Sequence, residues 1–448
     1  MSFNYLTNIQ LDAARGDYLS VLIGNGLSFR VERVFVADAF GRVTSSAVYA
    51  LICAPHYNAS AMDGIALDAR VTFGASETTP VSLTAEQYVF VDTGDPLPSG
   101  CDSVVMIEDV IDSGDGVIKL FSAAAPRQHV RQIGEDICAG EMILPSFSKI
   151  TPAAIGAMIA AGVTEVFVIT RPVVGFIPTG SEVVAPTPNP REGEVLEFNS
   201  AIFSAMLSQW GADMITYPIV RDDPVLIREM LDAALSECDI VILGAGSSAG
   251  REDYCADVIA DVGTVLYHGI AIKPGKPTIL GYFGEKPIIG LPGYPVSGII
   301  VLEQIVRPII DFLYHRVRDD DRFAVATLSK SVVSTLKYHE FVRVRLGYVR
   351  DKLVASPLGR GSGIVTSFMR ADGILEVIQE VEGYESGEDV RVRLLRSDNE
   401  LRRSIVVIGS HDPLIDELSD LLCMRSSGIS LSSAHVGSMG GLIAVRKG

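Results

Sequence analysis

The run VVGFIP at residues 173–178 begins the stretch of sequence that decides the fold of this chain. Apolar and amphipathic runs alternate from there to about residue 314. The apolar runs are MITYPIV (214–220), DIVILG (239–244), VLYHGIAI (265–272) and IIGLP (288–292), and the amphipathic runs are NSAIFSAMLSQWGA (199–212), DPVLIREMLDAALSE (223–237), YCADVIADV (254–262) and VSGIIVLEQIVRPIIDFLY (296–314). Strands that alternate with helices predict a mostly parallel, doubly wound sheet. We assign residues 171–316 to this α/β domain, in which Asp222 and Asp223 before Pro224 form a good helix start.

The flanking regions show other patterns. Residues 1–170 begin with a helical pattern and continue with short β runs such as YVFV (88–91), which Gly and Pro residues interrupt. This pattern predicts a mixed α+β region of two intertwined lobes. Residues 320–396 show period-two alternation, as in FVRVRL (341–346), and predict a small, barrel-like β domain. The chain of 448 residues is therefore predicted to be an α/β multidomain protein with three or four domains.

Residues 403–448 form a separate segment at the end of the sequence. After Arg403 they continue with SIVVIGSHDPLIDELSDLL (404–422), which predicts a strand, a tight turn and a helix. About 45 residues are too few to bury both faces of an α/β sheet. The segment is therefore either a truncated domain or one that a partner completes.

Composition and charge narrow the class of protein. The chain is 48% hydrophobic and 21% charged, as in a globular protein, and its formal charge of -18 argues against nucleic acid as a partner. It lacks the pattern of a signal peptide and any apolar run of about 18 residues, so we expect a soluble, cytoplasmic protein without membrane contact. The cysteines lie too far apart for a zinc site, and we interpret them as small, buried apolar residues: Cys53, Cys101, Cys138, Cys238, Cys255 and Cys423.

Ligands of an open α/β sheet bind beyond the carboxyl ends of its strands, where four polar loops are expected. The first is Thr179-Gly180-Ser181-Glu182, and the second is GAGSSAGRED after the strand DIVILG. Backbone N–H groups near Gly246, Ser247, Ser248 and Gly250 could cradle a phosphate, although such a turn is as often only a tight connection. The other two loops are KPGKP (273–277) and LPGYPVS (291–297).

Charged residues in these loops suggest an anion and a cation. Lys273 and Lys276 lie close together between prolines, so both ammonium groups could bind one anion, or they could be solvated surface lysines. Glu182 and Asp253 would reach the same sheet edge and could hold Mg²⁺, while helix capping is the alternative role for Asp253. In the first region, NASAMDG (58–64) and DTGDPLP (92–98) could be ordinary turns.

Seven short sequence motifs carry a resemblance to a known family. They are P-x-x-N-x-S-A-M-D-G (55–64), T-G-x-P-L-P-x-G-x-D-x-V-V-x-x-E (93–108), R-x-x-G-E-D-I (131–137), T-G-x-E (179–182), K-P-G-K-P (273–277), L-P-G-x-P-V-S (291–297) and S-P-L-G-R-G-S-G (356–363). Over roughly residues 5–396 the chain resembles the molybdopterin molybdenumtransferases, the MoeA and gephyrin E-domain family.

The resemblance implies an elongated homodimer with its cleft between the pterin-binding α/β domain of one subunit and the other domains of its partner. An adenylylated molybdopterin and molybdate (or tungstate) would bind there, and Mg²⁺-dependent cleavage with release of AMP would accompany metal insertion. It implies catalytic roles for Asp63, Thr93, Asp136, Glu182 and Asp253, with Mg²⁺ on Glu182 and Asp253. It implies substrate contacts at Ser60, Thr179, Gly180, Gly246, Ser247, Ser248, Gly250, Lys273, Gly275, Lys276, Pro292, Gly293, Pro295 and Ser297. Protein partners would be a pterin adenylyltransferase and the apoproteins of molybdoenzymes.

Three words depart from the family pattern, namely GAGSSAG in place of GGVSVG, Ser181 in place of an acid, and Tyr294 in place of a small amide. These changes keep two other functions open, a molybdopterin adenylyltransferase and a non-catalytic scaffold or sensor that binds pterin or oxyanion. The terminal segment resembles the start of a periplasmic-binding-like (LysR-substrate-binding-like) domain, with Ser410, His411 and Ser438 as candidate anion contacts.

Overall fold

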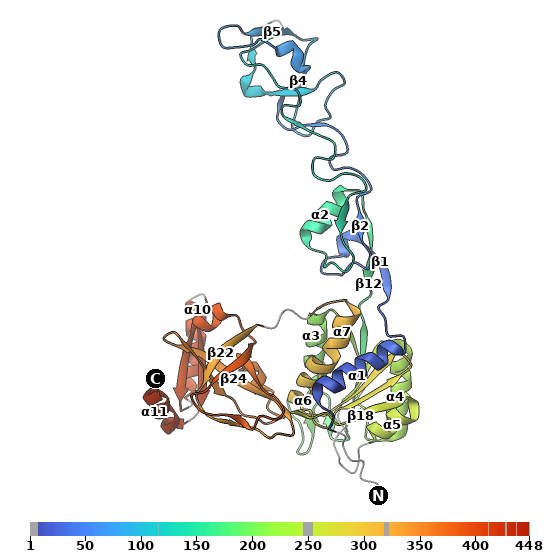
Figure 1. Ribbon diagram of the computed structural model, residues 1–448, viewed down its shortest axis with the longest axis vertical. Coiled ribbons are helices and arrows are strands. Elements are labelled where there is room, and N and C mark those ends of the chain that lie inside the picture. Colours follow the sequence, from blue (N-terminus) through green and yellow to red (C-terminus); the bar gives the residue numbers. More distant parts are fainter. Residues whose placement is uncertain are drawn as a thin grey trace. The chain divides into compact units, whose positions relative to one another are not determined.

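The computed structural model describes residues 8–114, 116–244, 254–317, 322–410, 412–425, 428–435 and 437–447. The chain divides into two compact units (Figure 1): one is Phe29–Thr170, and the other joins Met1–Ser28 to Arg171–Gly448. Each unit has hydrophobic cores of its own.

The unit Phe29–Thr170 contains two lobes, and its two ends form the first lobe. There, β1 (Val31–Phe35) pairs antiparallel with β12 (Glu165–Ile169), and β2 (Val48–Tyr49) pairs with β11 (Met142–Leu144). The helix α2 (Pro152–Ala160) packs beside the 3-10 turn η1 (Val36–Asp38). Their buried side chains share one core, which includes Val36, Ile150, Met158 and Val168.

The second lobe is built from short strands. Its sheets are β6–β4–β7, β5–β9–β8 and the pair β3–β10. The bounds are β3 (Ala59–Ser60), β4 (Gly64–Leu67), η2 (Ala69–Thr72), β5 (Val81–Thr84), β6 (Val89–Val91), β7 (Ser103–Met106), η3 (Ile107–Asp109), β8 (Ile111–Asp112), β9 (Val117–Leu120) and β10 (Val130–Arg131). Ile65, Leu67, Leu83 and Leu120 lie in its core, which is separate from that of the first lobe.

The α/β domain of the other unit has the predicted doubly wound sheet. Its strand order is β16–β13–β17–β21–β20–β18; the first four strands are parallel, and β20 and β18 are antiparallel. The strands are β13 (Val173–Pro178), β16 (Asp213–Thr216), β17 (Ile240–Gly244), β18 (Thr264–His268), β20 (Ile279–Phe283) and β21 (Lys286–Leu291). Two further short strands, β14 (Val183–Val184) and β15 (Val195–Leu196), pair outside the sheet.

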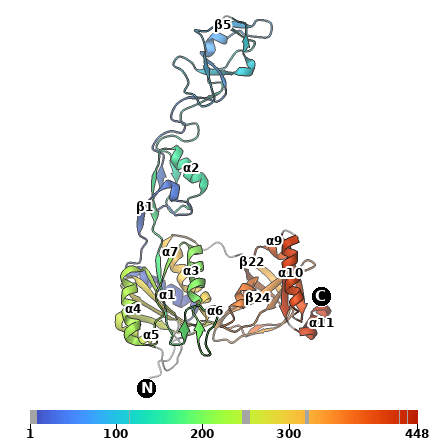
Figure 2. The ribbon, with the colours of Figure 1, turned by 180° about the vertical axis from the view of Figure 1, so that it is seen from behind.

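Helices cover both faces of this sheet (Figures 1 and 2). On one face lie α4 (Pro224–Glu237) and α5 (Cys255–Val262), whose buried side chains pack against β17 and β21. On the other lie α3 (Asn199–Trp210), α6 (Pro295–Val301), the π-helical turn η4 (Leu302–Val306) and α7 (Arg307–Leu313). Asp223 caps α4 as predicted, because its carboxylate accepts hydrogen bonds from the Val225 and Leu226 N–H groups.

The first helix of the chain belongs to this unit. We expected residues 1–170 to form one N-terminal region, but α1 (Leu11–Gly24) packs with the α/β domain. The reason is its buried face: the Tyr18 hydroxyl donates to the Gly281 carbonyl (2.6 Å), and Leu11 and Leu22 are buried beside it. Burial raises the pKa of Tyr18 well above its ordinary value.

The β-rich domain closes into a barrel of the predicted kind. Five strands pair in the circular order β24–β25–β22–β28–β26 and back to β24, and β19 (Ile272–Lys273) adds to β24 from the α/β domain. The bounds are β22 (Phe323–Leu328), β23 (Val332–Val333), β24 (His339–Val349), β25 (Lys352–Pro357), α8 (Thr366–Met369), β26 (Gly373–Val377), β27 (Gly383–Tyr384) and β28 (Asp389–Leu394). An ion pair between Arg393 and Glu303 (2.7 Å) also joins the two domains.

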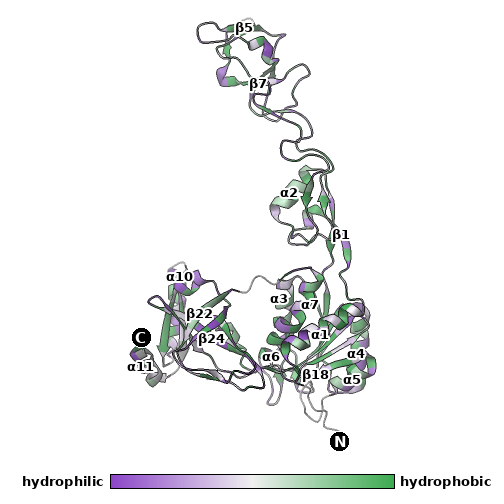
Figure 3. Ribbon diagram, viewed as in Figure 1, coloured by the Kyte–Doolittle hydropathy of each residue, from purple (hydrophilic) through white to green (hydrophobic). Residues whose placement is uncertain are grey.

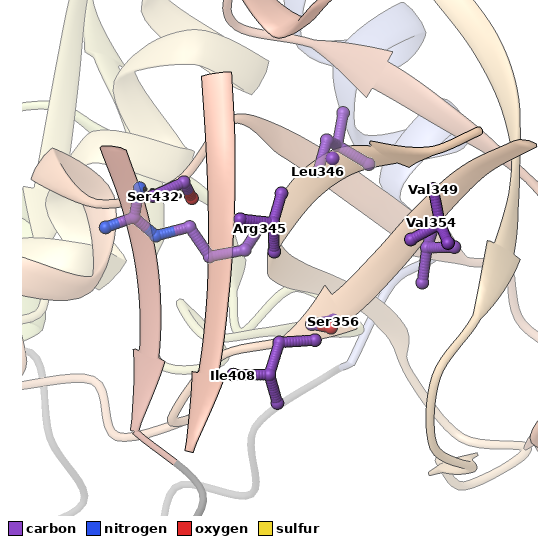
Figure 4. Close-up of a pocket in the computed structure, with 9 residues that line it drawn as sticks. Arg345, Leu346, Val349, Val354, Ser356, Ile408 and Ser432 are labelled. Carbon is purple, nitrogen blue, oxygen red and sulfur yellow. Dashed lines mark hydrogen bonds between the residues drawn. The ribbon is translucent and has the colours of Figure 1, made fainter. Parts of the chain in front are cut away.

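The terminal segment packs against the barrel. It contains α9 (Asp398–Arg402), β29 (Ser404–Gly409), α10 (Pro413–Arg425), β30 (Ser430–His435) and α11 (Gly437–Lys447), and β29 pairs parallel with β30. Figure 4 shows the pocket at this junction, where the Arg345 guanidinium donates to the Ser432 hydroxyl (2.9 Å). Gly347 is required there, because a Cβ would lie 1.9 Å from Val406 Cγ2. None of the predicted site residues lines this pocket.

Hydropathy differs between the helices (Figure 3). The helix α2 is hydrophobic along its length, whereas α10 carries several hydrophilic residues. No helix among the described residues has the length and apolar character needed to cross a membrane.

The cysteine prediction is partly wrong. Cys238 and Cys255 are buried as expected, but Cys53 and Cys101 are half-buried, and Cys138 and Cys423 are exposed. Cys138 lies in a turn, and Cys423 lies on α10, which has no buried residue, so neither position offers a core.

Candidate active site

Three parallel strands of the α/β sheet end side by side. Pro178 at the end of β13 is in register with Gly244 at the end of β17, and Gly244 is in register with Leu291 at the end of β21. The loops that begin at Thr179 and Pro292 therefore start at one edge of the sheet, where ligands of such folds bind. The loop between them carries Gly246, Ser247, Ser248, Gly250 and Asp253, which all lie outside the described residues.

The first loop is held closely against the sheet. The Thr179 N–H and hydroxyl both donate to the Gly244 carbonyl, at 2.6 and 3.1 Å. Gly180 has φ +141°, and a Cβ on it would lie 2.5 Å from Val183 Cγ2, so only glycine fits. The same Cβ position is 3.3 Å from Glu182 Oε2, which means that the exposed Glu182 carboxylate folds over Gly180.

Asp222 adds a second carboxylate to this loop. Its Oδ2 accepts a hydrogen bond from the Ser181 N–H (2.9 Å), and its own N–H donates to the Ser181 hydroxyl (3.3 Å). The acidic side chain of Asp222 therefore lies beside Ser181, the position at which the family motif has an acidic residue. Sequence reasoning placed Asp222 only at a helix start, beside Asp223, and did not assign it to the site.

The KPGKP loop brings its lysines to the barrel. Lys273 pairs with Glu340 in register between β19 and β24, and the Lys273 Nζ lies 3.5 Å from Glu340 Oε1. Lys276 Nζ lies 5.7 Å from the centroid of the Tyr338 ring. Gly275 has φ +114°, and a Cβ there would lie 2.8 Å from Ile272 Cδ1. The two lysines therefore flank the start of β24.

Glu340 joins cations from two loops. It is 3% exposed, accepts a hydrogen bond from the Ser334 hydroxyl (2.9 Å), and lies 3.4 Å from the Arg360 guanidinium as well as beside Lys273. One buried carboxylate thus holds two cations, which leaves a net positive charge facing solvent. Sequence reasoning missed both Glu340 and Arg360, although Arg360 lies within the motif SPLGRGSG (356–363).

A buried arginine shapes the loop that carries Arg360. Arg343 donates to the carbonyls of Gly359 (2.8 Å) and Gly361 (3.1 Å) and to the Ser367 hydroxyl (3.1 Å). Burial lowers the pKa of this guanidinium from its ordinary value, and the charge of Glu340 acts in the opposite direction. The two bonds to the carbonyls fix the loop on both sides of Arg360.

The LPGYPVS loop meets the same barrel loop. The Val296 N–H donates to the Ser362 carbonyl (3.1 Å), and a Cβ on Gly363 would lie 3.5 Å from Tyr294 Cδ1. Asn199, another residue that sequence reasoning missed, donates to the Gly293 carbonyl (3.0 Å). Ser297 is 3% exposed in the first turn of α6, and Pro292 and Pro295 are buried, so Gly293 and Tyr294 are the exposed part of this loop.

The N-terminal sequence motifs lie together in the second lobe of the unit Phe29–Thr170. Asp63 Oδ1 accepts hydrogen bonds from the Thr93 N–H (2.6 Å) and hydroxyl (2.7 Å). These bonds lower the pKa of Asp63 below its ordinary value, the backbone bond most strongly. Gly64 after it must be glycine, because a Cβ would lie 1.9 Å from the Val105 carbonyl oxygen.

Hydrogen bonds hold the other N-terminal motifs close to the Asp63–Thr93 pair. The Gly94 N–H donates to the Ser60 carbonyl (2.9 Å), and the Ser60 hydroxyl donates to the Met62 carbonyl (2.5 Å). The Asp136 N–H donates to the Ala54 carbonyl (3.0 Å), while its side chain is exposed. The predicted residues therefore form two groups, one in each unit, and each group is assembled from separate words of the sequence.

Known protein families match three consecutive parts of the chain. Three family descriptions match in order: the MoeA N-terminal region (domain I and II) over residues 9–162, a probable molybdopterin binding domain over 175–311, and the MoeA C-terminal region (domain IV) over 325–395. The terminal segment after residue 395 lies outside these matches.

Individual relatives cover most of the chain. A molybdopterin molybdenumtransferase of Nostoc is 30% identical over 61% of this chain and 67% of its own length. A putative molybdopterin biosynthesis protein of Methanocaldococcus jannaschii is 29% identical over 82% of this chain and 93% of its own length. The crystal structure of a MoeA protein from Pyrococcus horikoshii superposes with a TM-score of 0.73 at 30% identity, and the match covers 87% of this chain and 100% of that one. The chain therefore belongs to the MoeA family, the molybdopterin molybdenumtransferases of molybdenum cofactor biosynthesis.

Proposed function

We propose that this protein inserts molybdate, or tungstate, into the dithiolene of an adenylylated molybdopterin and releases AMP. The observation that carries the proposal is the cationic group around Glu340, which lies beside loops from the edge of a molybdopterin-binding type of sheet. Lys273 and Arg360 share one buried carboxylate, so their positions are set before any anion arrives.

Both substrates are anions, and the cations divide between two kinds of contact. Arg360 has a planar guanidinium that can bind two oxygens of one phosphate, whereas Lys273 and Lys276 act as compact point charges. Lys273 keeps half of its side chain exposed despite its contact with Glu340, so its ammonium can reach a ligand. Pyrophosphate and tetrahedral oxyanion are the two groups that this set would hold.

Carboxylates at the sheet edge fit a hydrated Mg²⁺. This ion is usually bound in proteins by one or two carboxylates together with water and substrate phosphates. The Glu182 carboxylate lies at the end of β13, Asp222 lies at the neighbouring Ser181, and Asp253 is proposed as a further ligand. Among the described residues no group of three or more acidic, His or Cys side chains could hold a metal alone, so phosphate oxygens would complete the shell. Bound Mg²⁺ would neutralise charge on the phosphates during cleavage.

Asp63, Thr93 and Asp136 are proposed to orient substrate or water. The hydrogen bonds from Thr93 favour the ionised form of Asp63, since they lower its pKa, and they orient its carboxylate. An oriented carboxylate can accept a proton or a hydrogen bond from a water near the scissile phosphate. The contribution of this group is positioning of reactants.

The protein is proposed to act as a homodimer. The helix α2 is apolar all round, yet only Ala154 and Met158 are buried, and an apolar helix of this kind is normally covered by protein. Phe35, Phe40 and Phe167 of the same lobe are also exposed. These exposed apolar side chains support a self-complementary contact, which would let one subunit supply Asp63 and its partner supply Lys273 to a shared cleft.

The test follows AMP release. Purified protein is incubated with adenylylated molybdopterin and Mg²⁺, with and without molybdate, and compared with Lys273→Ala, Glu182→Gln and the surface control Lys352→Ala. We expect molybdate-dependent AMP release that falls about tenfold or more in the first two variants and stays unchanged in the control. Pterin binding without AMP release would instead support a scaffold or sensor, and unchanged rates in all variants would remove the proposed site.

A further inference from the structure

Two cysteines oppose each other where the chain enters and leaves the second lobe. Ala54 and Ile137 form an antiparallel bridge with both backbone bonds, from the Ala54 N–H to the Ile137 carbonyl (2.9 Å) and from the Ile137 N–H to the Ala54 carbonyl (3.3 Å). Cys53 and Cys138 are the next pair along the two segments. Residues next to such a pair have Cα atoms about 4.5 Å apart, and a disulfide spans about 4.4–6.8 Å between Cα atoms.

The two sulfur atoms lie in one small region. The Ala139 N–H donates to Cys53 Sγ (3.3 Å), so the Cys53 sulfur sits against the backbone beside Cys138. A Cβ built on Gly134 would lie 2.7 Å from Cys138 Sγ and 3.7 Å from Cys53 Sγ. The sulfurs are therefore separated by no more than the sum of these two distances, and rotation of the side chains can bring them together.

The two thiols differ in exposure, which assigns them different parts in oxidation. Both are free cysteines; Cys138 is exposed and Cys53 is half-buried. An oxidant in solution meets Cys138 first, and Cys53 is held close enough to react with the oxidised sulfur. This is the arrangement of a sensor cysteine beside a resolving cysteine.

We propose that Cys53 and Cys138 form a reversible intramolecular disulfide on exposure to hydrogen peroxide. The Cys138 sulfur attacks one peroxide oxygen, the O–O bond breaks, and a sulfenic acid and water form. The Cys53 sulfur then attacks the Cys138 sulfur, the S–O bond breaks, and the oxygen leaves as a second water with the thiol proton. Two thiols and one peroxide thus give one disulfide and two waters. A dithiol reductant restores both thiols.

The disulfide would act close to the candidate site in this lobe. It joins the segment that leads to Pro55 and Asp63 to the turn that carries Asp136. These segments already share backbone bonds, from the Gly134 N–H to the Pro55 carbonyl (3.0 Å) and from the Asp136 N–H to the Ala54 carbonyl (3.0 Å). Oxidation would therefore tie together the two strands through which residues 54–137 connect to the first lobe. The inference does not depend on the proposed reaction.

The test maps the disulfide in the full-length protein. Reduced protein is treated with an equimolar amount of hydrogen peroxide, blocked with N-ethylmaleimide, digested without reductant and analysed by mass spectrometry. We expect two of the six cysteines to escape alkylation and one cross-linked peptide pair to join Cys53 to Cys138. Dithiothreitol should return all six thiols.

Three variants separate the steps. In Cys53→Ser, oxidation should stop at a Cys138 sulfenic acid that dimedone traps. In Cys138→Ser, Cys53 should form no disulfide. The control Cys423→Ser should form the same Cys53–Cys138 disulfide as the wild type. Disulfides between chains, or pairs that include Cys101 or Cys423 in place of this pair, would overturn the proposal. If a serine variant fails to fold, the peptide map of the wild-type protein decides alone.

Discussion

At the scale of single residues, Glu340 organises the cationic part of the site. It is buried, yet its contacts, Lys273 and Arg360, are 51% and 33% exposed on their side chains. The ion pairs are therefore screened by solvent and contribute little to folding stability. Their effect is positional, because one carboxylate holds two cations from different loops at a fixed separation.

Replacement of Glu340 tests this role. Glu340→Gln keeps the shape and a hydrogen-bonding group but removes the charge that holds both cations. We expect kcat/KM for AMP release to fall about tenfold, the effect of about 1.4 kcal/mol of lost transition-state positioning. The exposed Glu385→Gln is the control in the same domain. Equal kcat/KM for Glu340→Gln and the control would refute the positioning role.

The pKa of Asp63 gives a second test at this scale. Thr93→Val removes the hydroxyl bond but leaves the backbone bond, which is the larger cause, so the Asp63 pKa should rise only part of the way to its ordinary value. Carboxyl NMR titration measures this change, with Thr84→Val as the control. Because the folded-state pKa is lowered, Asp63 stabilises the fold above its unfolded pKa, and this stabilisation is lost as the pH falls through the folded-state pKa. The part of the stability difference between wild type and Thr93→Val that depends on pH should therefore disappear in acid; an unchanged Asp63 pKa in the variant would contradict the account.

At the scale of elements, the site depends on close packing of α6 against α3. A Cβ on Gly298 of α6 would lie 2.4 Å from Phe203 Cζ of α3, and Phe203 is itself packed edge to face against Phe176 of β13 at 5.2 Å between ring centroids. The ring cannot move without disturbing β13, the strand that leads into the loop at Thr179. Gly298 therefore permits the close approach of α6, which follows the LPGYPVS loop, to α3.

Two glycine replacements should have opposite effects. Gly298→Ala forces its methyl into the Phe203 ring and should destabilise the α/β domain by about 1–3 kcal/mol. Gly16→Ala, on an exposed helix position of α1 with no atom within 4 Å of the new Cβ, should stabilise it by about 0.5–1 kcal/mol. Trp210, the one tryptophan of the chain, ends α3 and reports unfolding by fluorescence in urea. The same sign of change in both variants would contradict this packing argument.

Hydrophobic alternation and turn residues in the sequence predicted the secondary-structure elements well. They did not predict the long-range contacts between those elements. The doubly wound sheet and the closed barrel follow from local patterns and are confirmed, as is the cap at Asp223. Glu340 carried no such signal, since it lies in an ordinary alternating strand and meets Lys273 only through the pairing of β19 with β24. The docking of α1 was missed for the same reason: Tyr18 reaches Gly281, 263 residues away, and no local pattern records that contact.

At the scale of the whole molecule, the predicted residues fall into two groups in separate units. Asp63, Thr93 and Asp136 belong to one unit, and Glu182 and Lys273 belong to the other. Neither group has both the cations that contact Glu340 and the Asp63–Thr93 pair. A cleft shared between subunits is the arrangement that the homodimer proposal requires.

Mixed dimers test the shared cleft. Asp63→Asn and Lys273→Ala should each lose about tenfold or more of AMP release alone, because both clefts of either homodimer lack one group. Co-expression should restore about a quarter of wild-type AMP release, since half of the dimers are mixed and each mixed dimer has one intact cleft. Separate purification followed by mixing without subunit exchange is the control. No restoration in verified mixed dimers would mean that each cleft is built from one chain.

The central claim is the insertion of metal into the pterin, and reconstitution of a cofactor-free molybdoenzyme measures it most directly. The protein, adenylylated molybdopterin, Mg²⁺ and either molybdate or tungstate are incubated, and the product is transferred to the apoenzyme. We predict activity of the apoenzyme, bound metal in proportion to AMP released, and loss of both in Lys273→Ala. Bound pterin with neither AMP release nor metal in the product would contradict the claim.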